Sequence, residues 1–201
     1  MTRKHRNNNK APSAADIQYA PLAPEHFDGV LSLGNRIQGD GYLSHFSLEE
    51  MYHQGFHNNI NASYVAIYQG EIVGFRLTYA HSQWQPDEWC SVKKWPVDPT
   101  RVCYFKCNTV DDHLQGCGIG STLLALATEK AKEQGALAGL AHIWLASPGN
   151  SAFRYFSKNG GELIARHPGK WRYASIHEGY DCPVCPGFCE CEGAEMMLVF
   201  S

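Results

Sequence analysis

A glycine-rich stretch in the middle of the chain has the composition of a phosphate-binding loop. It runs from Val110 to Gly120, after a strand pattern and before a helical one, and it includes Gly116 and Gly118. Glycine lets the backbone approach an anion closely, and the free N–H groups at the start of a helix then face that anion. No lysine follows the last glycine, and the spacing matches neither of the common nucleotide-binding loops. The stretch predicts a diphosphate or phosphate site, with a ligand-free strand-to-helix turn as the alternative.

A cluster of cysteines near the end of the chain is the second candidate site. The clustered residues are Cys182, Cys185, Cys189 and Cys191, with the spacing C-x2-C-x3-C-x-C. Four thiolates are a ligand set of tetrahedral structural zinc, and thiols that lie together in a reducing compartment more often bind metal than form disulfides. We therefore expect one structural zinc. Free thiols, disulfides and an iron–sulfur cluster are the alternatives, and His177 is a substitute for one cysteine.

Hydrophobic periodicity predicts the elements that position these residues. Strands are expected over residues 17–22, 62–68, 71–80, 101–110, 142–146, 162–165 and 195–200. Helices are expected from Pro24, from Ser47 through a capping box with Glu50, over residues 121–134, and from Asn150 to Asn159. The cysteine-rich segment 178–193 then falls between the last two strands, as an insertion within one domain.

Composition and charge limit the class of protein. The chain has 201 residues, of which 44% are hydrophobic, and this favours one domain. Residues 1–15 are polar and Asn-rich, and we expect them to form a disordered arm before a domain at 16–201. No apolar run approaches the ~18 residues of a membrane span, and the first residues lack a secretory pattern, so a cytoplasmic protein without a membrane partner is expected. A net charge of -3 argues against a nucleic-acid partner.

Several segments together resemble the GNAT superfamily of N-acetyltransferases. Its acetyl-CoA motif, Q-x-x-G-x-G, is matched by Gln115, Gly118 and Gly120, and the flanking NTVDDHLQGCGIGSTLLALATEKAKEQG is similar as well. The hairpin YVAIYQGEIVGFRL resembles the second and third strands of the family, and NSAFRYFSKNGGEL resembles the helix after its fifth strand. The resemblance covers residues 62–163, about half of the chain.

The resemblance implies an α/β (α+β) fold with a central mixed, mostly antiparallel sheet of about seven strands flanked by helices. It implies an N-acetyltransferase in which a primary amine attacks acetyl-CoA directly. The implied cofactor-binding residues are Asn108, Thr109, Val110, Gln115, Gly116, Cys117, Gly118, Ile119, Gly120, Ser121 and Asn150. The acceptor is a small-molecule or peptide amine that the sequence does not identify, and a homodimer is left open.

The catalytic residues are less well defined than the loop. A tyrosine often protonates the CoA thiolate in this family, and alignment puts Phe156 at its position. The neighbouring Tyr155 is the candidate acid, with a packed aromatic residue as the alternative. His81, Glu88 and Asp40 are candidate bases by chemistry alone. The departure at Phe156 leaves two other functions open: a non-catalytic CoA-binding module, or a zinc-knuckle interaction protein on a GNAT scaffold.

Overall fold

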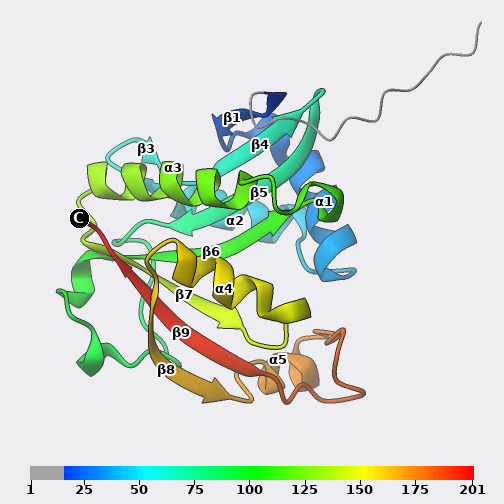
Figure 1. Ribbon diagram of the computed structural model, residues 1–201, viewed down its shortest axis with the longest axis vertical. Helices are drawn as coiled ribbons and strands as arrows, with labels where there is room; N and C mark the ends of the chain where they lie inside the picture. Colours follow the sequence, from blue (N-terminus) through cyan, green and yellow to red (C-terminus); the bar gives the residue numbers. More distant parts are fainter. Residues whose placement is uncertain (1–15) are drawn as a thin grey trace, which may run out of the picture.

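A seven-stranded sheet organises the protein in the computed structural model (Figure 1), which describes residues 16–201; the arm predicted for residues 1–15 lies outside the described residues. The strands are β1 (Gln18–Pro21), β4 (Tyr64–Tyr68), β5 (Glu71–Tyr79), β6 (Val102–Val110), β7 (Ala138–Trp144), β8 (Glu162–Pro168) and β9 (Glu192–Val199). Their order is β1-β4-β5-β6-β7-β9-β8, and only β6 and β7 are parallel among these neighbours. A separate ribbon pairs β2 (Phe56–His57) with β3 (Ile60–Asn61). The predicted fold class is confirmed.

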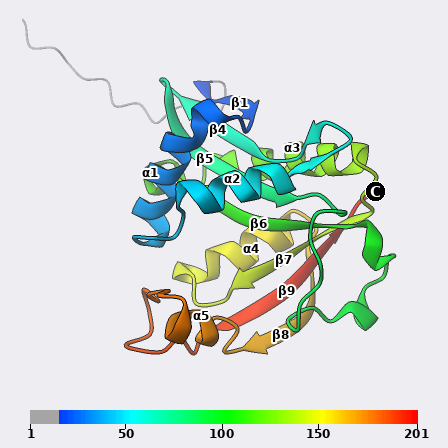
Figure 2. The same cartoon turned by 180° about the vertical axis from the view of Figure 1, so that it is seen from behind.

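Helices cover both faces of the sheet. The α-helices are α1 (Phe27–Gln38), α2 (His45–Gln54), α3 (Ile119–Glu133), α4 (Ser151–Lys158) and α5 (Arg172–His177). Short 3-10 turns occur at Pro24–His26, Val92–Lys94, Pro99–Arg101, Asp112–Leu114 and Pro148–Asn150. Helices α3 and α4 lie in front of the sheet in Figure 1, and α1 and α2 lie on the other face, which Figure 2 shows. None of the helices within residues 16–201 is long and apolar enough to span a membrane.

The alternation of β5 explains why both faces are covered. Phe75 and Leu77 are fully buried and pack with α1 and α2. On the opposite face, Gly74, the residue before Phe75, lies against α3, where an added Cβ would lie 3.0 Å from Ile119. Successive side chains of a strand point to opposite faces, so a strand that is apolar on both sides must lie between two helical layers.

Several predicted boundaries are wrong. Strand β8 ends at Pro168 and strand β9 begins at Glu192, each three residues beyond the predicted limit, because the two strands pair with one another there. Helix α2 begins at His45 because Ser44, not Ser47, is the N-cap: the Ser44 hydroxyl accepts a hydrogen bond from the Ser47 amide at 3.1 Å. Strand β7 begins at Ala138, four residues before the predicted start, because pairing with β6 and β9 offsets the low strand propensity of its first residues. There Gly139 lies directly against the Phe105 ring.

Strands β6 and β7 separate after a short parallel contact. They are paired only between Val102–Tyr104 and Ala138–Leu140, while β7 stays paired with β9 along its whole length. A register shift between β5 and β6 leaves Lys106 as an extra residue of β6, and such a bulge bends a strand away from its neighbour. Within the described residues, the edge of β6 that faces β7 therefore has no strand partner beyond Tyr104, and the sheet opens beside residues 105–110.

Candidate active site

The glycine loop has the backbone geometry that an anion site needs. Gly116 and Gly118 have φ values of 84° and 83°, a left-handed conformation that favours glycine. Apart from the glycine itself and its two neighbours in sequence, no atom of the described chain lies within 4 Å of the position that a Cβ would take at either residue. A ligand can therefore approach the backbone here, and a side chain would occupy that space.

The start of α3 presents free hydrogen-bond donors to this space. The helix begins at Ile119, and its first backbone bond runs from Thr122 N–H to the Gly118 carbonyl at 3.0 Å. Within residues 16–201, the amides of Gly118, Ile119, Gly120 and Ser121 donate to no protein acceptor. Unpaired amides and the positive end of the helix dipole together favour an anion at this position.

Side chains from distant elements hold the loop in place. Arg36, on α1, pairs with Asp111 at 2.7 Å and with Asp112 at 3.3 Å. The Tyr155 hydroxyl, on α4, donates to the Gly120 carbonyl at 2.7 Å and accepts from Arg76 at 2.9 Å. These contacts fix both ends of the loop, so its open amides are pre-organised before a ligand arrives.

Two asparagines predicted to lie beside the CoA arm have unused acceptors. The side-chain oxygens of Asn108 and Asn150 are buried and have no hydrogen-bond partner within the described part of the chain. Asn108 lies on β6 beside the opening, and Asn150 caps α4 with a positive φ of 52°. A buried acceptor without a partner costs free energy, so these oxygens are suited to a ligand that brings N–H groups.

Tyr155 and Phe156 face different surroundings. Phe156 is 1% exposed and packs against Phe105 with ring centroids 6.1 Å apart. Tyr155 points instead to the junction of the loop and α3, where its hydroxyl is hydrogen-bonded on both sides. Its role as an acid stays a prediction, while its contacts support a part in positioning the loop.

The opposite face of the opening carries a tyrosine–histidine pair. The Tyr104 hydroxyl lies 3.0 Å from Nδ1 of His142, and Nε2 of His142 lies 2.8 Å from the Trp89 carbonyl. A carbonyl only accepts, so Nε2 carries the proton, and Nδ1 of the neutral ring accepts from the Tyr104 hydroxyl. Burial, followed by the charge of Lys170, lowers the pKa of His142 to about 4. Burial raises the pKa of Tyr104 above its usual range.

Comparison with known proteins now decides the family. The model of the acetyltransferase (GNAT) family matches residues 33–160, which include the loop, Tyr104 and His142. This chain belongs to the GNAT family. Membership supports an acyltransferase as the class of enzyme. No curated protein sequence matches the chain.

Solved structures agree with this assignment. A ribosomal-protein-alanine N-acetyltransferase from Brucella melitensis has a TM-score of 0.63 at 17% identity, covering 91% of this chain and 99% of that chain. Naa50 from Arabidopsis thaliana, in complex with the bisubstrate analogue CoA-Ac-MVNAL, has a TM-score of 0.62 at 14% identity, covering 92% and 99%. A GNAT family acetyltransferase from Elizabethkingia anophelis with acetyl-CoA bound has a TM-score of 0.59 at 18% identity, covering 92% and 99%. At these identities the likeness establishes a common fold.

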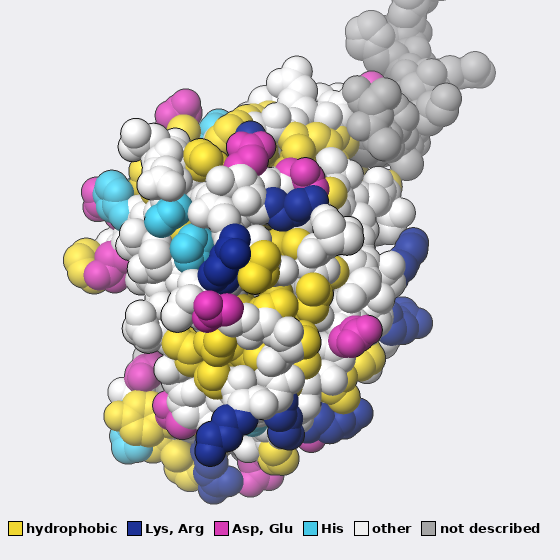
Figure 3. Space-filling model, turned by 90° about the vertical axis from the view of Figure 1, so that its left-hand side faces the viewer, with side chains coloured by type: hydrophobic (Ala, Val, Ile, Leu, Met, Phe, Trp, Pro, Cys, Tyr) yellow, Lys and Arg dark blue, Asp and Glu magenta, His cyan; other side chains and the backbone are white. Residues whose placement is uncertain are grey.

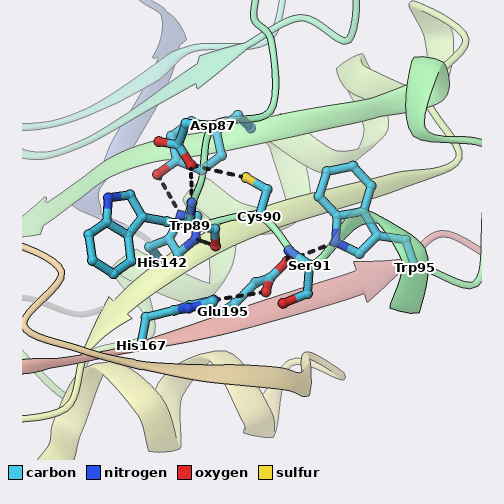
Figure 4. A network of polar contacts seen from close by, with 9 residues as sticks. Asp87, Trp89, Cys90, Ser91, Trp95, His142, His167 and Glu195 are labelled. Atoms are coloured by element: carbon cyan, nitrogen blue, oxygen red, sulfur yellow. Dashed lines mark hydrogen bonds and ion pairs between the residues drawn. The ribbon is translucent and has the colours of Figure 1, made fainter.

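A buried carboxylate ties the long loop between β5 and β6 to the far strands of this GNAT domain (Figure 4). Glu195 accepts from the Ser91 amide at 2.9 Å, from Trp95 Nε1 at 2.8 Å and from His167 Nε2 at 3.0 Å. Burial by itself raises the pKa of Glu195, but these hydrogen bonds outweigh burial and lower it. The anchored loop places the Trp89 carbonyl against His142, so Glu195 helps to position that ring.

Within the described residues, the three candidate bases form no hydrogen bond or ion pair with Tyr104 or His142, although Glu88 directly precedes Trp89, whose carbonyl contacts His142. His81 contacts the Thr100 carbonyl and, at the C-terminal end of α3, the Gln134 carbonyl. Helix α3 has 15 residues and is thus about 22 Å long. The glycine loop is at the other end of that helix. Asp40 and Glu88 are exposed. Sequence reasoning missed His142, although a histidine within the apolar run of residues 138–144 is a detectable signal.

A tyrosine–cysteine contact joins the loop after α1 to β6, and the four predicted zinc ligands lie together. The Tyr42 hydroxyl, in the loop after α1, donates to the Cys107 sulfur of β6 at 3.1 Å. The four clustered cysteines lie together between α5 and β9, with their sulfur atoms all within 4.8 Å of one another.

Figure 3 shows one face of the molecule, with Asp and Glu side chains interspersed among Lys and Arg and a hydrophobic area in its middle.

Proposed function

We propose that the protein is an N-acetyltransferase that transfers the acetyl group of acetyl-CoA to a primary amine. The observation that carries this proposal is the row of unpaired amides from Gly118 to Ser121 beside the opening between β6 and β7. An anion-binding helix start next to an open strand edge matches a ligand that has a pyrophosphate at one end and an amide-containing arm at the other.

Acetyl-CoA supplies an acetyl group that is activated as a thioester. The backbone from Gln115 through Gly116, Cys117, Gly118, Ile119 and Gly120 to Ser121 holds the pyrophosphate. The free edge of β6 at Asn108, Thr109 and Val110 pairs with the pantetheine arm as an added strand does. The unpartnered oxygens of Asn108 and Asn150 accept hydrogen bonds from the amides of that arm.

The Tyr104–His142 pair removes the proton from the acceptor amine. A free alkylamine has a pKa near ~10.4 and must lose a proton to become a nucleophile. The Tyr104 oxygen accepts this proton while its own hydroxyl proton passes to Nδ1 of His142, 3.0 Å away. Because burial lowers the pKa of His142 to about 4, the ring is neutral at physiological pH, and the lone pair of Nδ1 can take up the proton transiently.

No separate acid is needed at the leaving sulfur, because a thiolate is a far weaker base than an alkoxide and can leave without being protonated. Tyr155 is held by Gly120 and Arg76, and its main task in this proposal is to position the loop. Phe156, at the position of the family tyrosine, supports the assignment of proton transfer to other residues.

The acceptor is a small-molecule or peptide amine. Two of the structural neighbours are an enzyme named for ribosomal-protein alanine and a complex with a peptide-containing bisubstrate analogue. These names favour peptide N-termini as the first class to test. The aromatic side chains around the opening, Tyr42, Tyr104 and Trp89, offer apolar surface for a first side chain.

The experiment is an acceptor screen with the purified chain. Release of free CoA is followed with peptides of varied N-terminal residue, lysine peptides and small amines, and products are identified by mass spectrometry. We expect turnover with at least one amine. CoA binding without turnover for any amine would favour the non-catalytic module or the interaction scaffold. Absence of CoA binding would overturn the site itself.

A further inference from the structure

The cysteine-rich segment is packed in an unusual way for a surface loop. It follows α5 at the lower end of the sheet in Figure 1, beside the start of β9. Its large apolar side chains Val184 and Phe188 are 54% and 57% exposed, whereas Cys182, Cys189 and Cys191 are buried. A loop of this kind has little apolar core of its own, so something other than hydrophobic packing must hold it.

The four sulfur atoms form a compact group. Cys182 and Cys185 each lie near Cys191, with sulfur–sulfur distances of 3.7 Å and 3.5 Å, and all four sulfurs fall within 4.8 Å of one another. A tetrahedral zinc with Zn–S bonds of ~2.3 Å separates its sulfurs by about 3.8 Å. A disulfide needs a distance of about 2.05 Å, and all eight cysteines are free thiols.

We propose that Cys182, Cys185, Cys189 and Cys191 bind one structural zinc ion. Four thiols lose their protons as they coordinate the ion, and no electron transfer is involved. An iron–sulfur cluster binds its cysteines through different iron atoms. The short distances between the four sulfur atoms therefore favour a single ion. Four protein ligands leave no position open, so the ion holds structure and does not take part in catalysis.

The surroundings of the cluster suit charged sulfur ligands. The Glu190 amide donates to the Cys185 sulfur at 3.4 Å, and the Cys189 amide is fixed by the Ser175 hydroxyl of α5 at 2.8 Å. Trp144, at the end of β7, and Trp171, before α5, pack around the buried cysteines. Hydrogen bonds to ligands and an apolar shell are the support that structural metal sites use.

The cysteine-rich segment packs against the end of β7. Tyr180, two residues before Cys182, lies in the same cluster as the buried cysteines and Trp144, the last residue of β7. The segment therefore adjoins the end of the strand that carries His142. This consequence depends on the proposed function: without the metal we expect weaker amine binding with unchanged acetyl-CoA affinity.

The test is the metal content of the full chain, purified under reducing conditions without added metal. Native mass spectrometry and elemental analysis should find about one zinc per chain. The double variant Cys182→Ser/Cys185→Ser, which removes two ligands, should lose at least ~90% of it, while the control Cys90→Ser should keep it. A metal-free wild-type chain with four additional alkylatable thiols, or a chain with iron and sulfide, would overturn the proposal.

A second measurement covers the case in which the double variant does not fold. Wild-type protein treated with a chelator should show at least ~10-fold faster hydrogen exchange over residues 179–193 and little change over residues 115–133. Unchanged exchange in both segments on complete removal of zinc would contradict a structural role. Because neither measurement uses activity, the zinc proposal and the transferase proposal fail independently.

Discussion

The glycine loop and the Tyr104–His142 pair flank the same opening in the sheet, but they are assembled differently. The loop takes its donors from consecutive residues, Gly118 to Ser121, whose geometry is set by two left-handed glycines. The pair takes its members from β6 and β7 and its support from the loop that Glu195 anchors. A local site is visible as a sequence motif, whereas a site built from separate strands is visible only after the sheet has formed.

The largest expected effect concerns the buried ring of His142. Its pKa is about 4 in the folded state, whereas an unfolded chain has ~6.5. Between these values the unfolded chain binds a proton that the folded protein does not, so stability falls as pH falls from ~6.5 toward ~4, by about 3 kcal/mol in total. Denaturant unfolding of wild type and His142→Gln at pH 7 and 4.5 measures this difference. An equal loss of unfolding free energy in both proteins would show that groups other than His142 cause the pH dependence.

The proton relay is tested by Tyr104→Phe, which keeps the ring and removes the hydroxyl between the amine and His142. We expect kcat/KM for the amine to fall by ~100-fold, within the usual range of general base catalysis, with the Kd of acetyl-CoA unchanged. The matched control is Tyr79→Phe on β5, whose ring centroid lies 6.0 Å from that of Tyr104. Equal activity of Tyr104→Phe and wild type would assign the proton to another acceptor.

The loop is tested by Gly118→Val. A side chain at this φ of 83° occupies the space of the ligand, so acetyl-CoA should bind ~10-fold more weakly, about 1.4 kcal/mol. Gly70→Val is the control, because Gly70 has a similar φ of 87° in the turn between β4 and β5. Calorimetry that finds the same affinity in a folded Gly118→Val protein would remove the loop from the site.

The smallest effect is expected for Tyr155→Phe. Loss of its hydrogen bond to the Gly120 carbonyl should loosen the loop and raise the KM for acetyl-CoA ~3-fold, about 0.6 kcal/mol, with kcat nearly unchanged. Tyr173→Phe, at a position 64% exposed on α5, is the control. A kcat loss of ~100-fold would instead make Tyr155 the acid, as the general-acid range predicts.

The sequence by itself determined the elements whose signals are local. Strand alternation and the Gln69-Gly70 turn predicted the β4–β5 hairpin, and the glycine spacing with a following apolar helix predicted the loop and α3. Four cysteines within one short segment also pointed to a metal before the structure brought their sulfurs together. In each case the residues that interact are close in sequence, so their types and spacing carry the information.

Tertiary structure alone decided what depends on distant partners. The residue before Ser44, Leu43, is fixed by two hydrogen bonds to Asn35 of α1, which places Ser44 at the start of α2. The small residues of β7 form a strand because β6 and β9 enclose them. His142 and Tyr104 are 38 positions apart, and Glu195 is 104 positions from Ser91. Pairing across such separations depends on the strand order and register of the sheet, and local sequence propensity does not determine these.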